Sequence, residues 1–138
     1  MNDYIINIDK ARLQPEVIHK YLGEESYWAK NISLEQVLKR IENSFCVGIY
    51  FKEEQIGFAR VISDYTSFAY LADVFILEPH RGKGLSNQLM EFILSRNEFQ
   101  NIRRFMLATR DAHGLYEKFG FRPMANPERW MEIPLKEN

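Results

Sequence analysis

The segment from residue 74 to residue 89 constrains the fold more than any other part of the chain. Residues 74–77 are apolar on four consecutive positions and run directly into the glycine-bearing loop 78–84, which is followed by a helical pattern over 85–96. A strand that is apolar on consecutive positions is typical of the centre of a sheet, where both faces are buried. The segment therefore predicts a central strand that leads through a glycine turn into a helix.

This loop has the properties of an anion-binding site. The first turn of the helix presents backbone N–H groups, and the helix dipole adds partial positive charge there. Gly82 and Gly84 have no Cβ, so an anion can approach the backbone closely and the turn can use positive φ. Arg81 and Lys83 add full charges. An ordinary tight turn with charged flanks is the alternative, and neither the phosphate-loop nor the dinucleotide glycine pattern matches here.

The remaining elements predict one α+β domain, residues 1–138, with a mixed, mostly antiparallel central sheet flanked by helices. Ser33 and Gln36 form a capping-box pattern at the start of the clearest helix, which ends at 43–44. The other predicted helices lie at 15–21 and 112–119. The predicted strands lie at 4–8, 45–51, 55–63, 68–77, 105–108 and 130–135.

Composition excludes several classes of function. The 18 basic and 19 acidic residues leave a net charge of −1. The protein as a whole therefore has no positive electrostatic potential that would attract nucleic acid. No apolar run approaches the roughly 20 residues of a membrane span, and no signal peptide is visible, so we expect a soluble, cytoplasmic protein. Cys46 is the one cysteine and reads as a buried strand thiol. No spacing of His, Cys, Asp and Glu suggests a metal site.

Two motifs resemble the GNAT superfamily of acyl-CoA N-acyltransferases. The family signature [QR]-x-x-G-x-[GA] corresponds to RGKGLS at 81–86, and its C-terminal Tyr-x-x-x-Gly-Phe motif lies within LYEKFGF at 115–121. Ser86 departs from the usual Gly or Ala but is also small, and Glu78-Pro79 inverts the common Pro-Glu order. The two motifs occur in the expected order, and the element order resembles that of the family over nearly the whole chain.

The resemblance implies that acetyl-CoA is the cosubstrate. The backbone of the loop would hold the coenzyme A pyrophosphate, and the preceding strand would lend main-chain groups to the pantetheine arm and the acyl carbonyl. The residues to which these roles carry over are Phe75, Ile76, Leu77, Arg81, Gly82, Lys83, Gly84, Leu85 and Ser86.

Acyl transfer to an amine also needs a proton donor for the leaving thiolate and an acceptor for the amine proton. The resemblance assigns the donor to Tyr116, whose alternative role is packing against Phe119 and Phe121. Asp73 is the predicted base, because it stands in an apolar strand that leads to the acyl site; its alternative is a surface or edge residue in a cross-strand ion pair. His113, one helical turn before Tyr116, is a second candidate for moving a proton.

These inferences predict an N-acetyltransferase that transfers the acetyl group from acetyl-CoA to an amine by direct attack. The alternative is a catalytically inactive acyl-CoA-binding sensor. The acceptor, a small molecule or a peptide amine, and the acyl-chain preference stay open. Four aromatic residues lie in or beside connections where an acceptor could lodge, with filling of the loop interior as their alternative role: Tyr27, Trp28, Tyr65 and Phe68. The oligomeric state also stays open, with a homodimer among the possibilities.

Overall fold

A computed structural model describes residues 3–135 and contains one five-stranded sheet. The strands follow chain order across it: β1 (Tyr4–Asn7), β2 (Phe45–Phe51), β3 (Glu54–Ser63), β4 (Ala69–Ile76) and β5 (Phe105–Leu107). The pairs from β1 to β4 are antiparallel, and β4 pairs with β5 in parallel. The predicted α+β class with a mixed, mostly antiparallel sheet is confirmed.

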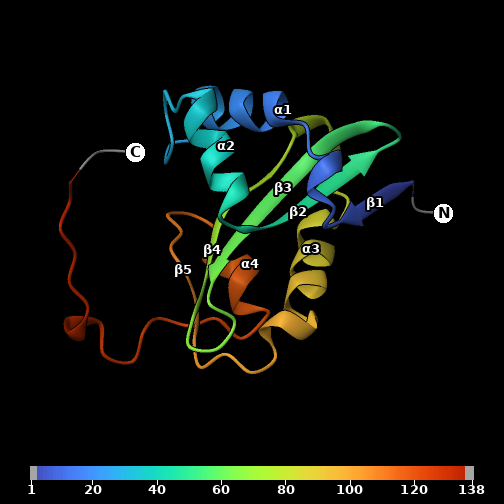
Figure 1. Ribbon diagram of the computed structural model, residues 1–138. Coiled ribbons are helices and arrows are strands. Elements are labelled where there is room, and N and C mark those ends of the chain that lie inside the picture. Colours follow the sequence, from blue (N-terminus) through green and yellow to red (C-terminus); the bar gives the residue numbers. More distant parts are fainter. Residues whose placement is uncertain (1–2, 136–138) are drawn as a thin grey trace.

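Helices cover both faces of this sheet (Figure 1). The helices are α1 (Pro15–Lys20), α2 (Leu34–Glu42), α3 (Leu85–Leu94) and α4 (His113–Glu117). A π-helical turn, Tyr21–Glu25, extends α1, and the predicted capping box of Ser33 and Gln36 opens α2.

The alternation of side chains along the strands divides the core in two. Val47 and Ile49 of β2 face α3, whereas Cys46 faces α1 and α2. The same alternation in β4 sends Ile76 to the first cluster and Phe75 to the second. The strand 74–77 is therefore covered on both sides, as its continuous apolar run predicts.

Two irregularities in β4 open the sheet where the glycine loop begins. The pairing of β3 with β4 shifts register between Phe58 and Arg60, and Asp73 on the opposite strand adopts φ 54°. The pairing of β4 with β5 ends at Leu71 and Leu107, so among residues 3–135 no strand pairs with residues 72–76 of β4 on the β5 side. The two strands diverge beyond that point, and the ladder between them does not continue along β4.

The prediction of a final strand at 130–135 is wrong: the structure has no strand there. These residues form no strand pairing; they are exposed and follow a course that leaves the body of the protein (Figure 1). The segment alternates the apolar residues Met131, Ile133 and Leu135 with Glu132 and Pro134. That pattern specifies which side chains share a face, but a strand also needs an edge to pair with.

Candidate functional site

The glycine loop has a backbone that only glycine adopts readily. Gly82 has φ 77° and Gly84 has φ 79°, and no atom lies within 4 Å of the place a Cβ would occupy on either residue. Gly84 is the N-cap of α3 and brings no side chain to cap it. The exposed N-terminus of the ten-residue helix α3 is therefore open to an anionic group, as the sequence predicts.

The two basic residues of the loop are placed differently. The Arg81 side chain turns back to β4, where Nε donates to the carbonyl of Ile76 at 2.8 Å and a terminal nitrogen donates to the Tyr21 hydroxyl at 3.2 Å. Lys83 is exposed beside the helix N-terminus. The Arg81 side chain thus ties the loop to the end of β4 and to Tyr21. The Lys83 side chain is exposed to solvent.

The side chains of the strand that leads into the loop belong to the core. Phe75 is buried and its ring stacks on Tyr21, with 4.2 Å between centroids. Ile76 is also buried, and the Leu77 N–H donates to the carbonyl of Ile56 at 2.8 Å. What these residues can offer a ligand is the main chain of β4 on the side where β5 has diverged. The main-chain role that the resemblance implies for these residues stays a prediction.

Asp73 lies at the centre of a buried polar cluster. Its carboxylate forms ion pairs with Arg60 of β3 and with Arg40 of α2, the latter at 3.0 Å, and it accepts a hydrogen bond from the Trp28 indole at 2.7 Å. The Asp73 side chain is only 2% exposed. The positive φ of Asp73 is uncommon for a residue with a side chain, and the three partners hold it in that conformation.

This environment bears directly on the predicted base. The carboxylate accepts from two guanidinium groups and an indole, and with its side chain only 2% exposed little of it is open to a substrate amine. The ion pair with Arg60 across the strands agrees with the alternative given for Asp73, but the surface or edge position expected with it is wrong, because the carboxylate is buried. Arg40 and Arg60, which complete it, were not anticipated, because neither stands in a motif.

Tyr116 is placed by α4 on the other side of the divergence. The residue is 8% exposed, and its ring meets Phe121 edge-on at 5.9 Å. Burial raises the pKa of Tyr116 above its ordinary value, and the neighbouring Tyr27 and Asp111 raise it further. The phenol is therefore protonated at neutral pH, the state that a proton donor requires.

Tyr27 connects the two halves of the candidate site. Its hydroxyl accepts a hydrogen bond from the Arg110 N–H at 3.1 Å, and the Arg110 guanidinium lies 3.7 Å from the centroid of its ring. Trp28 meets Tyr27 edge-on at 5.1 Å. The connection before α2 is thereby joined to the segment between β5 and α4. Arg110 is a further residue that the sequence did not single out.

The other titratable candidates contribute less. His113 is exposed at the start of α4. Cys46 is 2% exposed, and burial raises the pKa of its thiol to about 11, so it stays protonated, as expected for a buried strand thiol. Among residues 3–135 no group of three or more His, Cys, Asp or Glu is arranged to hold a metal. No helix in that range is long and apolar enough to cross a membrane.

The structure thus contains an exposed helix N-terminus preceded by two glycines at positive φ, a strand that pairs with β5 only as far as Leu71, and a protonated phenol on α4. Comparison with known proteins shows which family the chain belongs to. The sequence matches the family described as Acetyltransferase (GNAT) domain over residues 13–133. It is 33% identical to a protein of Gracilaria tenuistipitata var. liui named as an uncharacterized N-acetyltransferase, over 86% of this chain and 76% of that protein.

Solved structures agree with this match. A protein of Xanthomonas campestris pv. campestris described as belonging to the GNAT family is 44% identical, with a TM-score of 0.94 over 96% of this chain and 94% of that one. A GNAT family acetyltransferase of Elizabethkingia anophelis, solved with acetyl-CoA bound, shares the fold at 15% identity, with a TM-score of 0.66 over 96% and 88% of the two chains. The chain therefore belongs to the GNAT family of acetyltransferases and is an acyl-CoA-dependent N-acetyltransferase.

Proposed function

We propose that this enzyme transfers an acetyl group from acetyl-CoA to an amine by direct attack of the amine on the thioester. The observation that carries the proposal is the open N-terminus of α3, entered through two glycines at positive φ beside the diverging main chain of β4. Acetyl-CoA has a pyrophosphate and an extended amide-containing arm, which these two features can bind. The acetyl-CoA bound to the Elizabethkingia protein, which shares this fold, adds support.

In the proposed reaction the main-chain N–H groups of residues 81–86 bind the pyrophosphate, and Lys83 adds a charge. The main chain of residues 75–77 aligns the pantetheine arm and donates to the thioester carbonyl. When the amine nitrogen attacks that carbonyl carbon, negative charge develops on the oxygen, where a fixed donor lowers the barrier by a few kcal/mol. The carbon–sulfur bond then breaks, and Tyr116 donates its proton to the departing thiolate.

For Asp73 we propose a positioning role in place of the base. The bulge at Asp73 sets where the following residues of β4 present their N–H groups, and Arg60, Arg40 and Trp28 fix that bulge from one side. The amine proton is then taken by water or by His113, which is exposed near Tyr116. Asp73 acts on the reaction only through the shape of the strand.

Asp73→Asn separates these two roles. Removing the negative charge leaves two arginines uncompensated, so we expect the free energy of unfolding to fall by about 3 kcal/mol, the usual cost of breaking a buried ion pair. The rate is expected to fall by a similar factor at every pH, because the bulge is altered and no base is lost. Chemical denaturation and a pH profile of kcat measure the two effects.

The control for this variant is Glu35→Gln, which removes an exposed carboxylate from the first turn of α2. It is expected to change neither quantity by much. A loss of rate confined to neutral pH and recovered in alkali, where free amine is abundant, would return the role of base to Asp73.

The function itself is tested by titrating acetyl-CoA and by following release of free coenzyme A thiol with a panel of amines. The panel should include polyamines, amino acids and peptides with free N-termini. We expect micromolar to millimolar binding, in the usual range for enzyme substrates, and amine-dependent release of thiol. Binding without release for every amine would support the sensor alternative, and absence of binding would contradict the proposed cosubstrate.

A further inference from the structure

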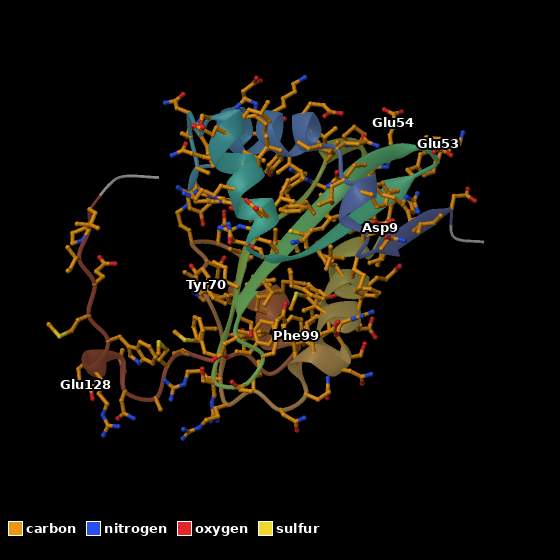
Figure 2. The ribbon with its side chains drawn as sticks, viewed as in Figure 1. Asp9, Glu53, Glu54, Tyr70, Phe99 and Glu128 are labelled. Carbon is orange, nitrogen blue, oxygen red and sulfur yellow. The ribbon has the colours of Figure 1, made fainter. Side chains whose placement is uncertain are left out.

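Two segments that are distant in sequence meet at Tyr27. This residue lies in the connection before α2, and its hydroxyl accepts a hydrogen bond at 3.1 Å from the main-chain N–H of Arg110, which follows β5. Figure 1 shows the two segments side by side next to α2. In Figure 2, Tyr70 marks the paired part of β4 and β5, and both segments lie above it, toward the end at which these strands diverge. The contact is therefore beside the strand that is proposed to bind the pantetheine arm.

Tyr27 and Arg110 are held in place and still have hydrogen-bond donors to offer. The Arg110 guanidinium lies 3.7 Å from the centroid of the Tyr27 ring, a cation–π contact that uses none of its N–H groups as hydrogen-bond donors. Within residues 3–135 no carboxylate forms an ion pair with Arg110, and the Tyr27 O–H has no acceptor. Both residues are exposed, and Trp28 meets the Tyr27 ring edge-on at 5.1 Å. An ordered surface thus presents a guanidinium and a phenol O–H that lack an acceptor.

A second cationic group lies on the other side of Trp28. The Trp28 indole donates to Asp73, and the same carboxylate pairs with Arg40 and Arg60, so this cluster has two guanidinium groups and one carboxylate. The Arg40 side chain is 27% exposed and that of Arg60 is 10% exposed. The uncompensated positive charge of the cluster therefore reaches solvent mainly at Arg40. Two cationic groups flank the aromatic pair of Tyr27 and Trp28, and their combined field attracts anions.

This surface is close to the proposed proton donor. Tyr27 and Asp111 are near enough to Tyr116 to raise the pKa of its phenol. Asp111 is exposed and directly follows Arg110, so a carboxylate and a guanidinium stand next to each other in the chain beside that phenol. An acceptor that carries a positive amine and a negative group would find an oppositely charged side chain for each of them here.

We propose that the acetyl acceptor is an amine that carries a carboxylate, as amino acids do, and that Arg110 and Tyr27 bind this carboxylate. The inference rests on the proposed acetyl transfer and specifies its acceptor. A guanidinium binds a carboxylate through two parallel N–H···O hydrogen bonds, and the Tyr27 O–H can donate a third. A polyamine has only positive charge, so Arg40 and Arg110 would repel it.

Matched pairs of amines test the class of acceptor. Release of coenzyme A thiol from acetyl-CoA is measured with glycine, β-alanine and γ-aminobutyrate, with the carboxamide of each, and with spermidine. For at least one pair we expect kcat/KM to be roughly 10- to 100-fold higher for the acid than for its amide, the value of a charge-assisted hydrogen bond. The amine of an amino-acid amide is less basic than that of the acid, so more of it is neutral near pH 7. The comparison is therefore weighted against the proposal.

Arg110→Gln tests the residue assigned to the carboxylate. The variant keeps the main-chain N–H that binds Tyr27 and removes the charge, so kcat/KM for the acid should fall by the same factor, mainly through a higher KM. The rate with the amide and the affinity for acetyl-CoA should not change. Arg110→Lys keeps the charge without the two-pronged geometry and should recover part of the loss. Arg103→Gln, which removes an exposed arginine from the other end of β5, is the matched control and should behave as the unchanged enzyme.

The possible failures of this inference and of the proposed function differ. Equal kcat/KM for every acid and its amide, or a preference for spermidine, would overturn the carboxylate acceptor while acetyl transfer itself stood. A folded Arg110→Gln enzyme that still prefers the acid by the full factor would overturn the assignment to Arg110. Binding of acetyl-CoA without thiol release for any of these amines or for the wider panel would contradict the transfer, and the acceptor with it.

Discussion

Gly84→Val is expected to weaken acetyl-CoA binding by at least 100-fold. The Cβ of the valine would meet no protein atom, since nothing lies within 4 Å of that position. It would instead occupy the open space in front of the α3 N-terminus, where the pyrophosphate is proposed to bind. A bound phosphate needs the backbone N–H groups at hydrogen-bond distance, and a branched side chain at the N-cap prevents this approach. Calorimetric titration with acetyl-CoA measures the effect.

Backbone strain must be separated from the steric effect, because Gly84 has φ 79° and valine is unfavourable there. Gly120→Val is the matched control: Gly120 has φ 97°, is exposed and has no atom within 4 Å of its Cβ position, but it lies after α4. Both variants should lose stability, and only Gly84→Val should lose affinity. Equal affinity of the folded Gly84→Val protein and the unchanged protein would show that coenzyme A binds elsewhere.

Tyr116→Phe is expected to lower kcat by roughly 10²-fold or more, within the usual range for general acid catalysis. The substitution removes one oxygen and keeps the ring that packs against Phe121. Packing and acetyl-CoA affinity should therefore barely change. The measurement combines kcat, acetyl-CoA affinity and melting temperature. Tyr65→Phe, which removes an exposed hydroxyl from the connection between β3 and β4, is the control and should be fully active.

The pH dependence follows from the raised pKa of Tyr116. The phenol loses its proton at higher pH in the folded protein than in the unfolded chain. Its contribution to stability is therefore fully present below the unfolded value of about 10 and is lost as pH rises above it. Between pH 6 and 9 the donor stays protonated, so any limb of the kcat profile in that range belongs to another group. An unchanged kcat in the Tyr116→Phe variant would show that Tyr116 only packs in the core and is not the proton donor.

The fold and the loop could be predicted because they depend on neighbours in sequence. Positive φ at Gly82 and Gly84, the capping box of Ser33 and Gln36, and the double burial of residues 74–77 each follow from local chemistry. Two motifs in the right order then indicated the family. The order of the predicted helices and strands along the chain, together with the family resemblance, then indicated the arrangement of the sheet.

The surroundings of Asp73 could not be predicted, because its partners are distant in sequence. Trp28, Arg40 and Arg60 lie 45, 33 and 13 residues away, and no pattern in the sequence connects them. An acidic residue in an apolar strand is compatible with a base or with an ion pair, and only its surroundings distinguish the two. The register shift in β4 is likewise a product of pairing between strands.

The sequence by itself determined where the glycine loop lies and which faces of the strands are apolar, since glycine conformation and side-chain alternation are properties of short segments. Tertiary structure alone decided that Asp73 is held by two arginines and that residues 130–135 join no strand pairing within the described range 3–135. Both depend on which surfaces meet after folding. A pattern of alternating residues specifies a face to be buried, but only the fold supplies what buries it.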